Sequence, residues 1–500
     1  MLLFVFSIQG PMNNSHNNHF DLQSIARQVM LQYGFQPDFS AQVQEQLAHL
    51  QRGPSPVESA PAAKDLRALL WSSIDNDTSR DLDQIEVAER LQDGSIKVMI
   101  GIADVDAFVE KGSPIDQHAA RETTTIYAGV RNFPMLPEQL STGATSLLPN
   151  NDKLCLVTEF MVSADGQINA QNFYRAIVRN RAQLAYNSAG AWLEDRAPAP
   201  QAIAESPEMQ AQIKLQDETA QLLKRERYRH GALNLETNEL HPILLSDHKV
   251  GLEKQTKNRA TELIEDFMIA ANGAVARQLE KSRISSIRRV VKTPERWDRI
   301  VELAAKHGYK LPVQPDSKAL NNFLTQQKAS EPDRFADLSL SVIKLIGPGE
   351  YVVEHPGEPA PGHFGLAVQN YTHSTAPNRR FADVVMQRLL KSMLGDQASP
   401  YSEGELESIA RNCTQKEDAA RKVERAMSKR IAAVTMMNRI GEVFDAVVTG
   451  VTPGGTFVRA LQAHVEGLLV HAQGLDVGDR LRVKLISADP QRGYIDFSRA

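Results

Sequence analysis

Four aspartates within one short segment are the residues of this chain best suited to chemistry. Asp75, Asp77, Asp81 and Asp83 follow the apolar residues 69–71. Carboxylates at this spacing repel one another unless water or a hard cation neutralises them. The cluster therefore predicts a divalent metal site, and the fold around it decides which metal chemistry it serves.

A calcium loop of the EF-hand kind and a solvated acidic turn are two local alternatives. With Asp75 in the first position, the twelve-residue calcium loop would end at Glu86. Its sixth position, which needs the conformational freedom of glycine, holds Arg80. The residues after Gly94 favour strands rather than a second helix. Both alternatives stay open on the local residues alone.

The composition is that of an ordinary globular protein. Its 500 residues allow two to four domains, and 42% of them are hydrophobic. No apolar run approaches the length of about 18 residues that a membrane helix needs. Cys155 and Cys413 match neither a zinc site nor a disulfide framework. We expect a cytoplasmic protein that contacts no membrane, with a disordered tail at 1–18.

The charge distribution says more than the net charge of −5. An acidic protein is a poor candidate for nucleic-acid binding. Basic residues nevertheless gather at 254–292 and 421–430. Either stretch alone is typical of a solvated helix face. Together with the aspartates, they favour a protein that guides a polyanion towards metal ions.

The N-terminal part predicts a small helical module at 19–52. Asp21 and Asp38 are suitable N-caps for two short helices, each with apolar residues at helical spacing. The module is either a helix-turn-helix or a docking arm. Proline and glycine at 53–64 indicate a linker.

A long body of mixed helices and strands follows. Alternating and apolar runs predict strands at 96–102 and 154–162. Apolar stripes at helical spacing predict helices at 258–281, 380–394 and 403–439. The fold class is therefore α+β.

The last residues, 441–500, differ from the body. Five short strands separated by glycine-rich turns predict a small barrel of the OB type. Phe457 and Arg459 are candidate RNA contacts, supported by fold analogy alone. Further basic residues of this domain are Arg480, Arg482 and Lys484.

The motifs of the body resemble those of the RNase II/RNase R (RNB) exoribonucleases. They lie, in the family's order, at 73–83, 102–105, 134–137, 363–366, 371–373 and 376–383. The resemblance covers 65–438, and 441–500 resembles the family's S1-type OB domain. It implies an RNB catalytic domain between the helical module and the barrel. The cold-shock domains usual before the catalytic domain are missing, so we expect a more open RNA entrance.

The resemblance implies processive hydrolysis of single-stranded RNA from its 3′ end. The products would be nucleoside 5′-monophosphates. The cofactor would be Mg²⁺, for which Mn²⁺ substitutes. In-line displacement at phosphorus needs metal ions to activate water and neutralise the leaving oxygen. No nucleotide-binding motif occurs, so we expect no nucleotide cofactor, and we expect a monomer.

Asp75, Asp81 and Asp83 stand at three of the family's four aspartate positions. The resemblance implies that Asp75 holds metal and that the other two hold metal or position the attacking water. At the fourth position the chain has Gln84, whose amide oxygen can bind Mg²⁺ but brings no charge. Three consequences of Gln84 are open: the metal binds more weakly, Asp77 contributes as a ligand, or the activity is lost. The alternative function is a catalytically weakened RNA-binding protein.

Several further residues of this chain match single functional positions of the family. Tyr127 matches an aromatic residue that stacks on the 3′-terminal bases, although a tyrosine at this spacing is also typical of a core. Leu235 stands where a second stacking aromatic is expected. Arg379 matches an arginine that grips phosphate near the scissile bond, a task suited to its planar fork. Arg380 is the fallback for this role.

Three acidic residues complete the predicted site. Glu424 matches a residue that supports catalysis, although its helical spacing also suits an intrahelical ion pair. Glu265 is a similar candidate for RNA binding. Asp104 either supports a metal ligand or caps a strand end.

Overall fold

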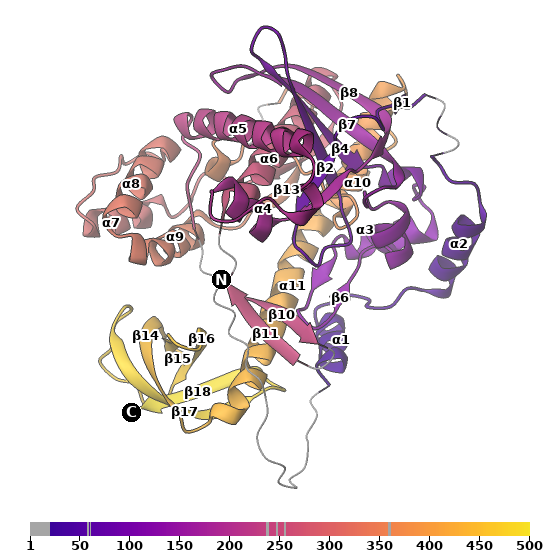
Figure 1. The fold of residues 1–500 in the computed structure, drawn as a ribbon. Coiled ribbons are helices and arrows are strands. Elements are labelled where there is room, and N and C mark those ends of the chain that lie inside the picture. Colours follow the sequence, from indigo (N-terminus) through magenta and orange to yellow (C-terminus); the bar gives the residue numbers. More distant parts are fainter. Residues whose placement is uncertain are drawn as a thin grey trace.

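A computed structural model describes residues 21–57, 60, 62–236, 240–246, 249–254, 257–358 and 362–500. The tail predicted at 1–18 lies outside the described residues. Helices and strands are mixed along the body, and a barrel of strands follows it (Figure 1). The predicted α+β class is confirmed.

A seven-stranded sheet forms the centre of the body, in the order β1-β8-β7-β4-β3-β2-β9. Neighbours are antiparallel except for the β1–β8 and β2–β9 pairs. Near-continuous apolar residues in β4 explain why this middle strand is buried on both faces. The strands are β1 Lys64–Asp65, β2 Ser72–Asp75, β3 Gln84–Arg90, β4 Ile96–Ala103, β7 Asp152–Val162, β8 Ile168–Arg179 and β9 Ala182–Ala185.

Helices pack on both faces of this sheet. On one face, α3 (Pro114–Glu122) and α10 (Phe381–Leu394) share a core with Ile85 and Val87 of β3. On the other, helices α4 (Tyr186–Leu193), α5 (Pro207–Arg229) and α6 (Arg259–Lys281) share a core with Ala88 of the same strand (Figure 1). Side chains of β3 therefore alternate between two cores, as a period of two requires.

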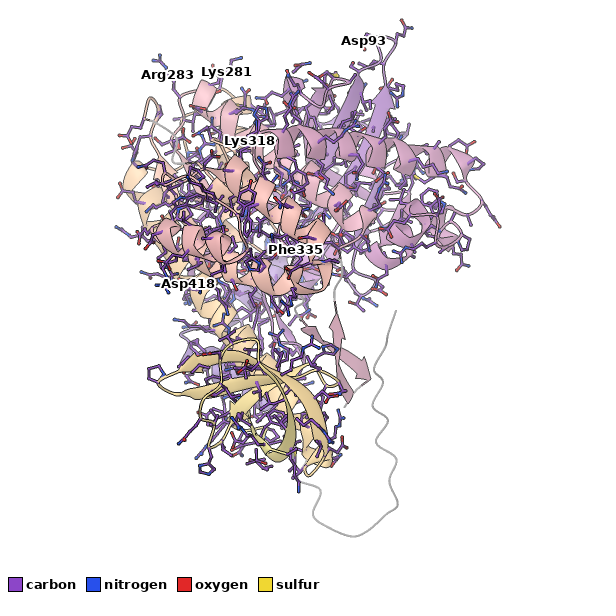
Figure 2. The ribbon with its side chains drawn as sticks, turned by 90° about the vertical axis from the view of Figure 1, so that its left-hand side faces the viewer. Asp93, Lys281, Arg283, Lys318, Phe335 and Asp418 are labelled. Carbon is purple, nitrogen blue, oxygen red and sulfur yellow. The ribbon has the colours of Figure 1, made fainter. Side chains whose placement is uncertain are left out.

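A small helical insertion was not predicted from the sequence. It comprises α7 (Trp297–Lys306), α8 (Ser317–Ser330) and α9 (Pro332–Ile346), between strands β12 (Ser286–Val290) and β13 (Glu350–Glu354). These helices have their own apolar core, which includes Phe335 of α9 (Figure 2). The insertion therefore packs largely as a separate unit.

The long helix α11 (Glu403–Met436) runs from the body to the barrel (Figure 1). The barrel is closed in the order β14-β15-β16-β18-β17, so the predicted OB-type barrel is confirmed. Its turn residue Gly493 approaches α11 closely, because a Cβ there would lie 3.1 Å from the Cβ of Lys429. The strands are β14 Val443–Thr452, β15 Gly455–Ala460, β16 Val465–Leu469, β17 Arg480–Asp489 and β18 Tyr494–Arg499.

The N-terminal helices are α1 (Leu22–Gln32) and α2 (Ala41–Arg52). Helix α1 shares an apolar cluster with α11, whereas residues of α2 belong to the core that contains α3. Their packing on the body favours the docking arm over a separate helix-turn-helix. Asp21 caps α1 as predicted, but Ser40 rather than Asp38 caps α2, and Asp38 pairs with Arg27 instead. The domain boundaries stay predictions.

Two two-stranded sheets lie outside the central sheet and the barrel. Strands β5 (Ile126–Tyr127) and β6 (Asn132–Phe133) form one, and β10 (Leu240–Ser246) and β11 (Lys249–Lys254) form the other. None of the helices in the described ranges is long and apolar enough to span a bilayer.

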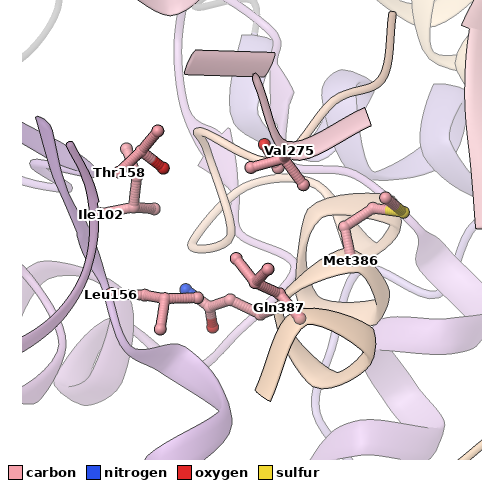
Figure 3. Close-up of a pocket in the computed structure, with 8 residues that line it drawn as sticks. Ile102, Leu156, Thr158, Val275, Met386 and Gln387 are labelled. Carbon is pink, nitrogen blue, oxygen red and sulfur yellow. The ribbon is translucent and has the colours of Figure 1, made fainter. Parts of the chain in front are cut away.

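A small cavity between the sheet and the α6 and α10 helices is a packing defect of the core rather than the site of chemistry. Ile102 and Leu156 line its sheet side, and Val275 and Met386 line its helix side (Figure 3). None of the predicted catalytic, metal-binding or RNA-binding residues lines it.

His118 of α3 should make stability depend on pH. Its side chain is 3% exposed, and burial, with the charges of Arg121 and Lys416, lowers its pKa from 6.5 to about 4. Between these pH values the unfolded chain binds more protons than the native state, so acid favours unfolding. We expect the unfolding free energy to fall by about 3 kcal/mol as pH drops through this window.

Urea unfolding at several pH values measures this contribution. His118→Gln should reduce the decrease by about 3 kcal/mol and leave the part caused by other histidines with a lowered pKa, such as His363 and His373. The exposed histidine of α2 provides the control His49→Gln, which should retain the whole decrease. An unchanged pH slope in His118→Gln would rule out His118 as the cause.

Candidate active site

Four segments distant in sequence form the candidate site. They are the β2–β3 connection, strand β5, the loop before α10, and the middle of α11. The loop before α10 is tied to the segment preceding β5 by two backbone hydrogen bonds. Thr125 donates to the Arg379 carbonyl at 3.0 Å, and Phe381 donates to the Thr123 carbonyl at 2.8 Å. These bonds place the arginines beside Tyr127.

Asp83 lies at the floor of the site and is 1% exposed. Its Oδ1 accepts a hydrogen bond from the Asn378 backbone at 2.9 Å, and its Oδ2 accepts one from Nε of Arg379 at 3.1 Å. Burial raises the pKa of Asp83 to about 7, against the opposing charge of Arg379. A bound cation would favour the ionised form and offset this penalty.

The two neighbouring arginines differ in how they are held. Arg379 uses Nε to bond Asp83, its side chain is 45% exposed, and its terminal nitrogens have no hydrogen-bond partner among the described residues. Arg380 instead binds both oxygens of the fully buried Asp383, at 2.9 and 2.7 Å. Arg379 is therefore free to take an anion, while Arg380 is committed to the fold.

Asp81 is linked to Tyr127 and Glu424. The Tyr127 hydroxyl donates to Asp81 at 3.0 Å, and the Tyr127 backbone donates to Glu424 of α11 at 3.2 Å. The Tyr127 side chain is exposed, so its ring is accessible to a ligand. Burial raises the pKa of Glu424. The structure therefore makes Glu424 a positioning residue for Tyr127 rather than an intrahelical ion-pair partner.

Asp75 ends β2 at the edge of the site. Its Oδ1 accepts hydrogen bonds from the Asn76 backbone at 2.7 Å and from the Ser79 hydroxyl at 3.0 Å. Burial raises the pKa of Asp75, again against the charge of Arg379. The strand before and the strand after this segment belong to one sheet, which excludes the helix-flanked calcium loop.

The donor set of this site fits a hard divalent cation. Carboxylates and an amide oxygen, from Asp75, Asp81, Asp83 and Gln84, are the ligands that Mg²⁺ prefers. In the described part of the chain, however, no three acidic, histidine or cysteine side chains lie close enough to form a ready-made metal cluster. Protein donors hold the carboxylates instead, so a cation would have to replace some of these bonds.

Glu86 is a buried acidic residue near the candidate metal ligands in sequence, and it was not predicted as a site residue. It was considered only as the last position of a calcium loop, yet it is fully buried on β3. Burial and the charge of Asp75 raise its pKa well above the usual range. The available signal was an acidic residue between the apolar Ile85 and Val87, two positions after Gln84.

Other predicted site residues have structural roles. Asp104 is buried and pairs with Arg175 and Lys391, which is a packing role near a strand end. Glu265 of α6 pairs with Lys257 at 2.7 Å. Asp77 is exposed and makes no side-chain contact with the other aspartates in the described part of the site. None of these contacts joins them to Asp83.

The predicted RNA contacts outside the aspartate cluster lie on two different units. Leu235 packs against the core of the helical insertion, and is therefore a packing residue. Phe457 and Arg459 point outward from β15, alternating with the buried Val458. Arg459 lies 3.8 Å from Asp337 of α9, so the barrel faces the insertion at this point.

Five basic residues of the stretch at 254–292 have acidic partners, namely Lys257, Arg259, Arg288, Arg289 and Lys292. Arg288 pairs with Glu354, and Arg289 pairs with Glu417 through two hydrogen bonds, at 2.6 and 2.8 Å. Lys281 lies on the outer surface, away from the barrel (Figure 2). Part of this stretch therefore stabilises the body, and its role in guiding a polyanion stays a prediction.

Comparison with known proteins places this site in a family. The site combines acidic side chains with an adjacent exposed arginine, and α11 joins the body to the OB-type barrel. Residues 63–396 match the RNB domain, and residues 442–500 match the RNase II-type exonuclease C-terminal S1 domain. The chain belongs to the RNB-domain family, so the predicted resemblance is confirmed.

Curated relatives are ribonucleases R. The chain is 29% identical to Ribonuclease R of Escherichia coli (strain K12) over 498 residues, which cover 91% of this chain and 59% of that protein. It is 29% identical to Ribonuclease R of Thermotoga maritima over 473 residues, covering 87% and 64%. The chain thus spans about three fifths of the length of the curated relatives it matches.

Solved structures share the fold. Mycoplasma genitalium RNase R in complex with ribose methylated single-stranded RNA has a TM-score of 0.85 at 22% identity, covering 97% of this chain and 79% of that chain. Yeast Ssd1, a pseudonuclease, has a TM-score of 0.70 at 16% identity, covering 95% and 58%. The fold therefore occurs in a ribonuclease and in a pseudonuclease, and only the site residues distinguish an active enzyme from an inactive one.

Proposed function

We propose that this protein is an exoribonuclease that hydrolyses single-stranded RNA from its 3′ end, in a processive manner, to nucleoside 5′-monophosphates. The observation that carries the proposal is the bond between the buried Asp83 carboxylate and an exposed arginine, Arg379, whose terminal nitrogens are free. Similarity to ribonucleases R supports the same activity. Cytoplasmic location and a monomeric state stay predictions.

In this proposal Asp75, Asp81 and Asp83, with Gln84, hold Mg²⁺, for which Mn²⁺ substitutes. The cation would activate the attacking water and neutralise charge on the leaving oxygen. Acidic side chains alone would repel an RNA phosphate. Arg379 opposes this repulsion, because its two free nitrogens can bind phosphate oxygens while Nε stays on Asp83. The arginine thereby orients the scissile phosphate over the carboxylates.

The terminal bases would be held by Tyr127. Its backbone is anchored by Glu424 and its hydroxyl by Asp81, so the exposed ring has a defined orientation. Burial and the charge of Asp81 raise the pKa of the Tyr127 hydroxyl, which therefore stays a donor to the carboxylate. Stacking of a base on this ring would place the adjacent phosphate near Asp81. The barrel, through Phe457 and Arg459, would bind RNA further from the cleaved end.

A catalytically weakened RNA-binding protein is the second candidate. Gln84 lowers the charge available to a metal, Leu235 replaces a stacking aromatic by an apolar packing residue, and the fold also occurs in a pseudonuclease. This candidate predicts RNA binding without shortening.

Incubation of 5′-end-labelled single-stranded RNA with the purified chain and Mg²⁺ separates the two candidates. Stepwise shortening with release of 5′-monophosphates, abolished by a chelator and restored by added Mg²⁺, is the expected result. Retention of full-length RNA in a stable complex would favour the weakened RNA-binding protein.

Tyr127→Ala should weaken RNA binding and leave the fold intact. Loss of one base–aromatic stack costs about 1–3 kcal/mol, so we expect RNA affinity to fall about fivefold to 150-fold. Filter binding in Ca²⁺, without cleavage, measures the affinity. Tyr127→Phe keeps the ring but loses the hydrogen bond to Asp81, and this variant should retain most of the RNA affinity. Equal losses in both variants would contradict stacking as the cause.

A further inference from the structure

Helix α1 packs beside the segment that carries Tyr127. Its residues Val29 and Met30 are buried in one apolar cluster with residues of β5, β6 and α11 (Figure 1). Phe35, which follows the helix, belongs to the same cluster and is 2% exposed. Residues 22–36 therefore form part of the packing around the candidate site.

This cluster determines how Tyr127 is presented. Its neighbours Ile126 and Ala128 are fully buried in the cluster, whereas Tyr127 between them is 40% exposed. Successive side chains of an extended segment point to opposite faces. Burial of the two neighbours therefore turns the Tyr127 ring outward, to the side where a base can stack on it.

The same cluster holds the helix that anchors the Tyr127 backbone. Val423 and Met427 of α11 are fully buried in it. Glu424 follows Val423 and accepts the hydrogen bond from the Tyr127 backbone at 3.2 Å. Helix α1 thus packs against both partners of this bond, the strand and the helix.

Polar contacts fix the turn that follows α1. Lys416 of α11 donates to the Gly34 carbonyl at 2.7 Å, and its Nζ lies 4.3 Å from the centroid of the Phe35 ring. The Gln36 backbone donates to the Glu122 carboxylate at 3.0 Å. The Lys416 ammonium lies 3.9 Å from the same carboxylate. The turn is therefore held to the end of α3 and to α11 at once.

Glu122 begins the segment that connects Tyr127 to the arginine loop. It is the last residue of α3, and Thr123 and Thr125 after it make the two backbone hydrogen bonds to the loop before α10. The α1 turn thus contacts the start of this segment, and the apolar cluster contacts its end at Ile126.

We propose that residues 22–36 position Tyr127 for stacking on the terminal base, with Met30, Phe35 and Lys416 as the positioning residues. The inference rests on the proposed exoribonuclease function and adds a role for the N-terminal helix. The segment acts through Tyr127 and needs no contact with RNA. A ring that is ordered before RNA arrives loses less conformational freedom on binding, so the affinity is higher.

Met30→Ala is expected to lower the affinity for single-stranded RNA about fivefold, because the packing behind Tyr127 loosens while the ring stays present. Filter binding in Ca²⁺ measures the affinity of the full chain. The matched control is Leu47→Ala in α2, a buried side chain of the core that contains α3 rather than of the α1 cluster. This control should bind RNA like the unaltered chain.

A double-mutant cycle with Tyr127→Ala separates positioning from a general loss of stability. In the Tyr127→Ala background, Met30→Ala should cause no further loss of RNA affinity, because the ring that it positions is gone. Lys416→Met removes the bond to Gly34 without opening a cavity, and its effect should depend on Tyr127 in the same way. Losses that simply add in the double variants, or an equal loss in Leu47→Ala, would overturn the inference.

Cleavage in Mg²⁺ distinguishes this inference from the proposed function. At saturating RNA the single-turnover rate of Met30→Ala should be retained, because only binding is weakened. Unchanged RNA affinity in Met30→Ala and Lys416→Met, with normal shortening of RNA, would overturn the inference alone. Binding of RNA without shortening by the unaltered chain would instead overturn the exoribonuclease function.

Discussion

Asp83→Asn is expected to lower the rate of RNA shortening by about a thousandfold, because the cation and the attacking water lose a charge worth several kcal/mol in the transition state. The substitution keeps the shape of the side chain. Its amide oxygen can still accept from the Asn378 backbone or from Arg379, whose bonds to Asp83 are 2.9 and 3.1 Å long. Single-turnover cleavage of end-labelled RNA in saturating Mg²⁺ measures the effect.

Binding and stability measurements on Asp83→Asn show whether the lower cleavage rate comes from the chemical step or from a damaged fold. RNA affinity in Ca²⁺ should be retained. The pKa of Asp83 is about 7 in the fold and 3.8 in the unfolded chain, so the native state binds more protons between these values. Ionised Asp83 therefore destabilises the metal-free protein above pH 7, and Asp83→Asn should be at least as stable at pH 8. A variant that unfolds more easily at this pH would point to a structural role instead.

Arg379→Lys should lower the cleavage rate about a hundredfold in saturating RNA, because a single ammonium group lacks the planar fork that bonds Asp83 through one nitrogen and presents two others to phosphate oxygens. The Arg379 side chain is 45% exposed, so its replacement leaves the core unchanged. We expect the unfolding temperature to stay the same. The measurement is single-turnover cleavage together with thermal unfolding of the same preparation.

The neighbouring arginine provides the matched control. Arg380→Lys breaks a two-point bond to the fully buried Asp383, so it should cost roughly 3 kcal/mol of stability. Its effect on the chemical step should be smaller than that of Arg379→Lys. If Arg380→Lys abolished cleavage in a stable protein while Arg379→Lys did not, the two roles would have to be exchanged.

Local patterns were sufficient for much of the fold. The apolar stripe predicted at 258–281 became α6 (Arg259–Lys281), and the run predicted at 154–162 became β7 (Asp152–Val162). Both elements have a strong period, and burial of one face follows from it. The helices of the insertion were not predicted, although the apolar spacing of α7 is strongly helical, and they pack mainly on one another. Their partners could not be predicted from local spacing.

The sequence by itself determined the chemical inventory: the spacing of Asp75, Asp81 and Asp83, the loss of charge at Gln84, and the strand pattern of the barrel. These features depend on neighbours along the chain. Only the tertiary structure decided that Arg379 rather than Arg380 is free, and that Glu86 is a buried carboxylate without a partner. The Arg380–Asp383 pair is local, but the burial of Asp83 and its bond to Arg379 join segments almost three hundred residues apart, which short-range patterns do not describe.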